Sequence, residues 1–349
     1  MSTRNQEGAS LHAVAAACGV SAMTVSRVLR NHPCVSAGTR RRVLGAAKKL
    51  GYAPDPYMAR LMARVRSHRH RRAEAVIAVV RDNHQGDDLL DTAYHYAPLK
   101  DISDQAARYG YRAEEFRLDR AKMSPTRLRQ ILEARGIEGV VVSPQSSQSI
   151  GREVDYAGLA AVTLGYGLTQ PPLHRASTNM TRGILQATRE LSARGYHRIG
   201  LAVSEWIDAR SDYTYTGAML NYQRRVAAPD RVPLLLFPKN NIAEDKKYFC
   251  AWFRRHRPDV IISFDTYVPD WLRKDLRISI PEECGLVIHD WTERCADFAG
   301  IDHRRPQVVA AAVDLLATQL LNNERGVPAV ARQVLIEPAW VEGPSIRAR

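Results

Sequence analysis

The strongest constraint on the fold is a pair of short helices predicted near the N-terminus. The first covers residues 11–18, Gly19 supplies the turn, and the second runs from an N-cap at Ser21 to Leu29. Their apolar positions recur at helical spacing, so the two helices can close a small core together: Leu11, Val14 and Ala15 in the first, and Val25, Val28 and Leu29 in the second. Such a pair predicts a helix-turn-helix.

The outward face of the second helix suggests what this unit binds. It is predicted to carry Ala22, Met23, Ser26 and Arg27. In a helix-turn-helix such a face enters the major groove of DNA. The alternative is a helical hairpin that merely covers a surface.

The charge distribution favours DNA. Residues 1–72 carry fourteen Lys or Arg and two acids, a net charge of +12, while the whole chain carries +13. The other 277 residues therefore carry only +1. A module that neutralises phosphates concentrates positive charge in this way, whereas a solvated surface spreads it.

A third helix follows, capped by Ser36, with Val43, Leu44, Ala47 and Leu50 expected in the core. With Thr24-Val25-Ser26-Arg27-Val28-Leu29 at this distance upstream, residues 10–61 resemble the LacI/GalR family of bacterial transcriptional repressors. The resemblance implies a DNA-binding head, a dimer, and a core with the fold of periplasmic binding proteins.

The resemblance also implies a hinge helix after the head. Asp55 is a suitable N-cap and Pro56 suits the first turn. Leu61 stands where family members wedge a leucine into the minor groove, although packing between paired hinge helices is the alternative. Met58 replaces the usual alanine and Asp55 the usual asparagine.

Residues 74–349 show apolar runs separated by helical stretches, the pattern of a parallel α/β protein. The predicted strands are 75–80, 139–142, 160–164, 199–203, 234–237, 260–262, 286–288 and a final one over 334–340. The first and third strands of each half recur after 123 and 120 residues, near Val76 and Ile199 and near Val140 and Val260. We therefore expect two similar Rossmann-like halves with a ligand cleft between them.

The expected domain organisation has three parts. A helix-turn-helix domain covers residues 1–53, and a hinge helix with a basic linker covers residues 54–73. The core covers residues 74–349, with a first subdomain over 74–175 and 302–330 and a second over 176–301 and 331–345. The fold class is thus a small all-α domain followed by an α/β core.

Residues that bind an effector are harder to assign. Asp290 aligns with an aspartate that contacts sugar hydroxyls in the family, but Thr214 and Phe264 replace its usual arginine and asparagine. These replacements argue against the common sugar-binding mode. The candidates, each of which could equally be a packing or surface residue, are Trp206, Arg210, Tyr213, Asp265, Asp290 and Trp291.

The sequence gives little support for a disulfide framework, a catalytic motif or a membrane span. Five scattered cysteines suit a reducing cytoplasm, and the chain has no CxxC, phosphate loop or nucleophile elbow. No apolar run approaches the ~20 residues of a membrane span. We therefore expect no metal, no cofactor and no membrane partner.

These observations predict a homodimeric repressor that binds a near-palindromic operator in double-stranded DNA and responds to a small molecule such as a sugar derivative. Ala22, Met23 and Arg27 are predicted to read base edges, and the remaining DNA contacts to be Ser21, Thr24, Ser26, Ser36, Thr39, Arg40, Tyr52, Met58 and Leu61. A core that responds to a partner protein, or an enzyme with a DNA-binding head, are the alternatives.

Overall fold

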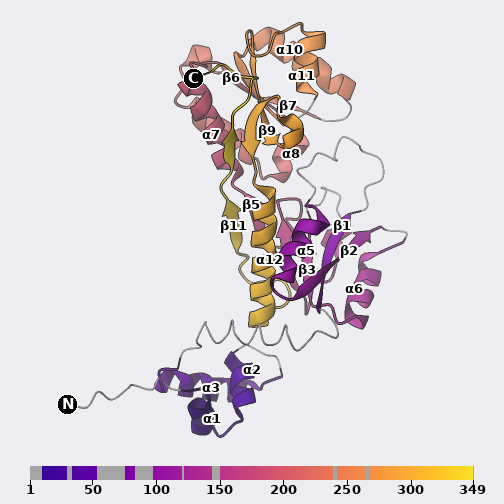
Figure 1. The fold of residues 1–349 in the computed structure, drawn as a ribbon, viewed down its shortest axis with the longest axis vertical. Coiled ribbons are helices and arrows are strands. Elements are labelled where there is room, and N and C mark those ends of the chain that lie inside the picture. The colour runs from indigo at the N-terminus through magenta and orange to yellow at the C-terminus, as the bar shows by residue number, and fades with distance from the viewer. Residues whose placement is uncertain are drawn as a thin grey trace, which may run out of the picture.

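The computed structural model describes residues 10–29, 34–52, 75–82, 97–119, 122–143, 150–238, 242–264 and 267–348. Within these ranges an all-α head precedes an α/β core of two lobes (Figure 1). Residues 54–73, predicted as hinge and linker, and the site candidates Met58, Leu61 and Asp265 lie outside the described residues.

The head contains three helices, α1 (Leu11–Cys18), α2 (Ala22–Leu29) and α3 (Ala37–Lys49). They surround a core of Val14, Ala15, Cys18, Val25, Val28, Val43 and Ala47. Leu44 and Leu50 are not part of it as predicted, because they are 48% and 41% exposed. Leu44 follows the inward Val43 by one residue, a rotation of about 100°, and Leu50 lies beyond the last helical residue.

The first lobe is a six-stranded sheet in the order β11-β5-β4-β3-β1-β2. Its strands, in chain order, are β1 (Ala75–Asp82), β2 (Tyr111–Leu118), β3 (Gly139–Val142), β4 (Ala160–Leu164), β5 (His174–Thr178) and β11 (Gln333–Ile336). Its helices are α5 (Leu99–Ala107), α6 (Pro125–Ala134) and α12 (Arg305–Asn322). All neighbouring strands are parallel, and α12 packs on β3, β4 and β5.

The second lobe has a second six-stranded sheet, in the order β12-β10-β9-β8-β6-β7. Its strands are β6 (Ile199–Ser204), β7 (Leu235–Phe237), β8 (Val260–Ser263), β9 (Gly285–Trp291), β10 (Ala299–Asp302) and β12 (Ala339–Val341). Its helices are α7 (Met180–Ala193), α8 (Glu205–Arg210), α9 (Thr214–Gln223), α10 (Ile242–His256) and α11 (Val268–Asp270). Strand for strand, this order repeats that of the first lobe, as the internal duplication predicted.

Two parts of the predicted core organisation are wrong. The single strand expected over 334–340 is two strands, because Pro338 has no N–H for a ladder and the chain leaves one sheet there for the other. Since β11 belongs to the first sheet, residues 331–345 are not all in the second subdomain. The boundary at residue 175 also cuts through β5, which lies wholly in the first sheet.

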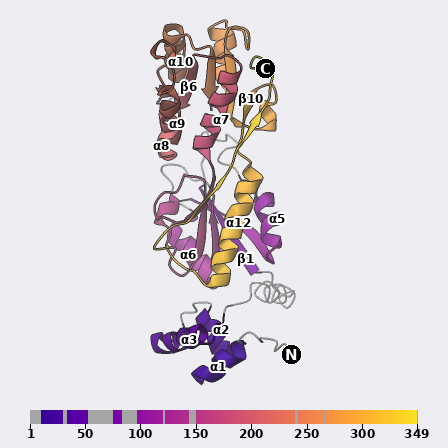
Figure 2. The same cartoon turned by 90° about the vertical axis from the view of Figure 1, so that its left-hand side faces the viewer.

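Three connections join the lobes, at Asn179, at His303 and Arg304, and at Glu337 and Pro338 (Figure 2). Because β5 leads directly into the second lobe, the carboxyl edge of the first sheet faces it. The Asn179 amide donates to the Glu337 carboxylate over 3.0 Å, which ties two of the connections together. Parallel α/β sheets bind ligands at such carboxyl edges.

No single helix among the described residues is long and apolar enough to cross a membrane. Helices α1 and α2 reach the required length and hydropathy only when counted together, and they are bent by 104°. These are the two helices of the head, whose apolar faces meet in its core.

Candidate nucleic-acid interface and effector cleft

The turn between α1 and α2 has the backbone geometry that the sequence predicted. Gly19 has φ 59°, in the left-handed region that glycine adopts most easily. The Ser21 hydroxyl accepts a hydrogen bond from the backbone N–H of Thr24 over 3.1 Å, as an N-cap does. The turn and the cap together fix where α2 begins.

On α2, the outward face is narrower than predicted. Met23 is 59% exposed, and Arg27 is also exposed. Ala22 is half-buried against the head core, because Ala22, Val25 and Leu29 share one face of the helix. Ala22 therefore does not point outward as expected, and Met23 and Arg27 are the long side chains that α2 presents to solvent.

The start of α3 places two further candidates together. The Ser36 hydroxyl accepts from the Thr39 N–H over 3.3 Å and donates to the Thr39 hydroxyl over 3.0 Å. Arg40 lies in the first turn of the same helix, whereas Tyr52 is half-buried against the head core. Arg42, which was not among the predicted contacts, donates to the Cys18 carbonyl over 3.2 Å and so places a positive charge at the C-terminal end of α1.

In the second lobe, α8 starts at the carboxyl end of β6 and carries two of the cleft candidates. The Arg210 guanidinium lies over the Trp206 ring at 4.6 Å, a cation–π contact. Tyr213 is 58% exposed and has φ 57°. Asp208, which was not predicted, is fully buried and accepts from the backbone N–H groups of Tyr215 and Thr216 over 3.2 Å each.

Asp290 and Trp291, at the end of β9, are both engaged within the protein. The Asp290 carboxylate accepts from the Arg305 guanidinium over 2.5 Å, and its side chain is 7% exposed. The Trp291 indole N–H donates to the Phe298 carbonyl over 3.0 Å. Asp290 thus fastens the start of α12 to the second lobe in this structure.

Phe264 stands where the resemblance expects an asparagine, and it is buried in an aromatic cluster. Its ring centroid lies 4.3 Å from that of Tyr215 and 4.5 Å from that of His289. Among the described residues neither ring nitrogen of His289 has a hydrogen-bond partner. Complete burial, with His303 nearby, holds the pKa of His289 well below its usual range.

In the first lobe, a buried cation lies at the carboxyl edge. The Arg81 guanidinium donates to the Glu115 carboxylate over 2.6 Å, to the Ser143 hydroxyl over 2.9 Å and to the Ala97 carbonyl. Burial raises the pKa of Glu115, but the hydrogen bonds from Arg117 and Arg81 outweigh it and lower that pKa overall.

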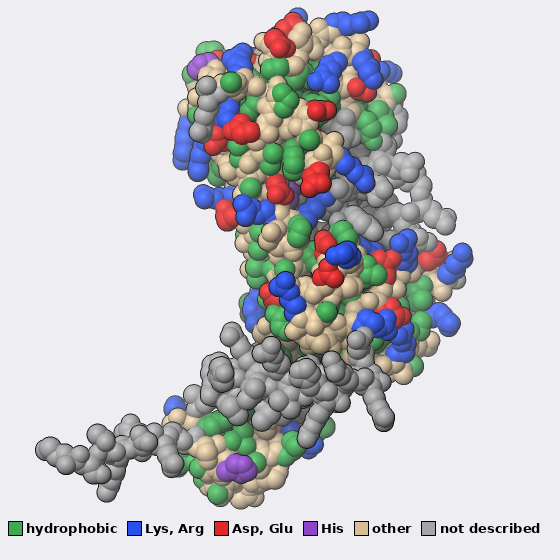
Figure 3. All heavy atoms as spheres, in the orientation of Figure 1, with side chains coloured by type: hydrophobic (Ala, Val, Ile, Leu, Met, Phe, Trp, Pro, Cys, Tyr) green, Lys and Arg blue, Asp and Glu red, His purple; other side chains and the backbone are tan. Residues whose placement is uncertain are grey.

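The described residues hold no group of three or more His, Cys, Asp or Glu side chains arranged to bind a metal ion. Acidic and basic side chains are interspersed over both lobes on the face in Figure 3.

Comparison with known proteins agrees with the arrangement of the head. Residues 10–55 match the model of bacterial regulatory proteins, lacI family. The transcriptional regulator CelR of Thermobifida fusca is 28% identical over 54% of this chain and 54% of its own. The regulator NtdR of Bacillus subtilis is 27% identical over 37% of this chain and 35% of its own. The chain thus spans between about a third and about half the length of these relatives.

Solved structures extend the similarity of fold to the core. A complex of CelR with cellobiose superposes with a TM-score of 0.59 at 20% identity, covering 97% of this chain and 99% of the other. The Lac repressor dimer bound to operator and the anti-inducer ONPF gives 0.55 at 18% identity, covering 98% and 100%. Residues 10–55 therefore match the lacI family of bacterial regulatory proteins, and the whole chain has the fold of these two solved structures.

Proposed function

We propose that this protein is a homodimeric, sequence-specific transcriptional repressor whose head reads operator DNA. The observation that carries the proposal is α2: a capped helix, fixed by a glycine turn, that presents Met23 and Arg27 to solvent from a strongly basic N-terminal segment. Arg27 suits the O6 and N7 acceptors of guanine, and Met23 suits a thymine methyl group. Ser21, Thr24, Ser26, Ser36, Thr39, Arg40 and Tyr52 are proposed phosphate contacts.

The dimer follows from the mode of reading. A two-fold dimer matches a two-fold operator, with one head in each half-site. We propose that residues 54–73 join head and core as a hinge, with Met58 and Leu61 in the minor groove. This role places the protein with the chromosome in the cytoplasm.

Selection of binding sites from random duplexes by the full-length protein tests this proposal. We expect enrichment of one near-palindromic sequence, with a footprint of two half-sites and a protein mass of a dimer on the DNA. Enrichment of no sequence above the starting pool would overturn the proposal, and a single unpaired half-site would remove the dimeric part of it.

We further propose that a small molecule bound between the lobes controls the repressor. The related structures hold cellobiose in one case and ONPF in the other. In this chain Phe264 is buried against Tyr215, Thr214 stands where the resemblance expects an arginine, and Asp290 is paired with Arg305. The proposed contacts are therefore the side chains at the rim, Trp206, Arg210 and Tyr213, with Asp265.

Thermal melting of the protein with a panel of metabolites separates this proposal from its alternatives. A metabolite that raises the melting temperature and is recovered unchanged supports a sensor. Chemical conversion of that metabolite supports an enzyme, and stabilisation only by a protein fraction supports a regulator that responds to a partner. A ligand that stabilises Trp206→Ala and Tyr213→Ala variants as well as the wild type contradicts the rim contacts.

A further inference from the structure

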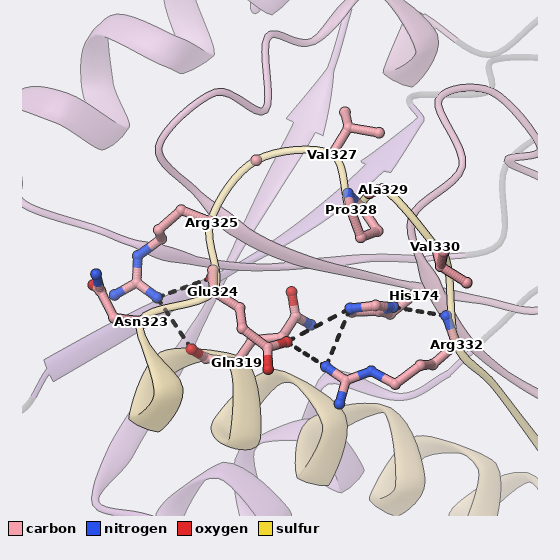
Figure 4. Close-up of a pocket in the computed structure, with 11 residues that line it drawn as sticks. His174, Gln319, Asn323, Glu324, Arg325, Val327, Pro328, Ala329, Val330 and Arg332 are labelled. Carbon is pink, nitrogen blue, oxygen red and sulfur yellow. Dashed lines mark hydrogen bonds and ion pairs between the residues drawn. The ribbon is translucent and has the colours of Figure 1, made fainter. Parts of the chain in front are cut away.

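The loop between α12 and β11 borders an open cavity of about 520 Å³ that lies away from the cleft. Residues His174, Gln319, Arg325 and Arg332 contribute polar walls, and Val327–Val330 contribute an apolar one. A volume of this size suits a small ligand. Figure 4 shows the loop arching over Glu324, His174 and Arg332, which meet beneath it.

The polar groups of the cavity are held in fixed positions. The backbone N–H of Arg332 donates to Nδ1 of His174 over 2.8 Å, so the proton of the neutral ring is on Nε2. The Gln319 amide is buried and bonds both to the N–H and to the carbonyl of Ala161 over 3.3 Å. Burial, and then the nearby Arg332 charge, lower the pKa of His174, so the ring stays neutral.

Arg332 supplies hydrogen-bonding capacity that the protein does not use. One terminal nitrogen of its guanidinium pairs with Glu324 and lies 3.2 Å from Nε2 of His174. Its other terminal nitrogen and Nε have no hydrogen-bond partner among the described residues, and its side chain is 45% exposed. Arg325, in contrast, is committed to Glu138 over 2.8 Å and to two backbone carbonyls.

An apolar wall stands beside this cation. Val327 and Val330 are 47% and 80% exposed, which is high for valine. A guanidinium with a free terminal nitrogen can donate charge-assisted hydrogen bonds to a carboxylate, and the valines offer contact to an apolar body.

The cavity also lies at one end of the three elements that connect the lobes. His174 begins β5, Gln319 lies near the end of α12, and Arg332 directly precedes β11. At their opposite ends the same elements run into the connections at Asn179, Arg304 and Glu337. A ligand that holds the three elements together at the amino edge of the sheet therefore acts on segments that set the angle between the lobes.

We propose that this cavity is a second ligand site, distinct from the cleft, for a small organic carboxylate with an apolar body, and that its occupancy is felt at the lobe connections. The carboxylate accepts hydrogen bonds from the free terminal nitrogen of Arg332, and the body lies against Val327 and Val330.

Titration calorimetry of the full-length protein with benzoate, and with benzamide as its neutral isostere, tests the site. We expect saturable binding of benzoate and at least about tenfold weaker binding of benzamide. Arg332→Gln should weaken benzoate binding by about tenfold or more. Because Val330 is exposed, Val330→Asp should weaken benzoate binding by charge repulsion and by loss of the apolar contact, without unfolding the protein. Val330→Asn, which is isosteric with the Asp variant but neutral, should weaken it clearly less, and the distant Arg189→Gln should bind as the wild type does.

Hydrogen exchange of the same samples shows which parts of the backbone benzoate binding protects. We expect benzoate to slow exchange over residues 319–332 and at the three lobe connections. No saturable benzoate binding, equal binding by the Asp and Asn variants of Val330, or protection around Trp206 and Arg210 instead would overturn the site. Protection restricted to residues 319–332 would overturn its link to the connections. Operator selection by the same protein is a separate readout, so failure here leaves the proposed DNA-binding function standing.

Discussion

The first lobe orders its strands β11-β5-β4-β3-β1-β2 and the second β12-β10-β9-β8-β6-β7, yet a buried histidine is bonded in one lobe and not in the other. In the first lobe, Arg81 is paired with Glu115, and His174 is bonded by Arg332. In the second, His289 lies among the rings of Phe264 and Tyr215 without a hydrogen-bond partner among the described residues. One topology therefore tolerates either arrangement, and the strand order alone does not determine the electrostatics of a lobe.

The edge strands differ for a geometric reason. β11 is parallel to β5, whereas β12 is antiparallel to β10. The carboxyl edges of the two sheets face each other, so a chain that passes directly from one sheet to the other runs with the strands of the first and against those of the second. The connection at Glu337 and Pro338 makes this passage without a helix.

The largest loss of stability is expected when the buried ion pair between Arg81 and Glu115 in the first lobe is broken. Arg81→Met leaves Glu115, whose side chain is 18% exposed, without its buried partner. We expect the free energy of unfolding to fall by about 3 kcal/mol, measured by denaturant titration. Adding Glu115→Gln should recover part of this loss. The control Lys100→Met removes an ion pair that is fully solvated and should leave stability unchanged. An equal loss of stability in the Arg81 and Lys100 variants would show that burial of the ion pair does not matter.

The pH dependence of stability tests whether the buried histidines of the second lobe are neutral in the folded protein. Burial lowers the pKa of His289 and of His303 in the folded protein, so below pH ~6.5 the unfolded chain binds protons that the folded chain excludes. The free energy of unfolding should then fall as the pH falls, by up to about 1.4 kcal/mol per pH unit for each such group. His289→Phe should reduce this slope, and an unchanged slope would show that His289 is already protonated in the folded protein.

The smallest change in stability is expected for the serine N-caps, which begin a helix in both lobes. Ser124 caps α6 in the first lobe and Ser204 caps α8 in the second, accepting from an N–H over 3.2 and 3.3 Å. Ser124→Ala should lower the free energy of unfolding by about 1 kcal/mol, while Ser124→Asp keeps the cap and should change it little. Equal stability of the Ala and Asp variants would show that the N-cap hydrogen bond of Ser124 does not stabilise the protein.

The sequence predicted most of the strands whose burial is continuous, although it missed β10, which is buried over its first three residues. β3 and β4 are buried throughout, with Thr163 as their one polar residue, and were predicted with their bounds. β2 was missed because it is an edge strand whose charged residues interrupt the alternation, and β5 because it begins with His174 and Arg175. Both owe their strand conformation to pairing with distant neighbours, which local pattern does not reveal.

The functional residues divide in the same way. The turn at Gly19, the cap at Ser21 and the exposed position of Arg27 could be predicted from sequence, because caps, turns and helix faces depend on spacing within a few residues. Arg81 and Asp208 could not, because their partners are supplied by the fold. The cavity brings His174 to Arg332, 158 residues later in the chain.

Reading of DNA by α2 is tested most directly by comparing wild type and Arg27→Ala on the selected operator and on a scrambled duplex of equal length. By fluorescence anisotropy at fixed salt concentration, we predict that the wild type prefers the operator by at least about a thousandfold. Arg27→Ala should lose about 1–3 kcal/mol on the operator, relax the preference at one base pair in each half-site, and bind the scrambled duplex nearly as the wild type does. An equal loss on both duplexes would make Arg27 a phosphate contact and contradict base reading by this helix.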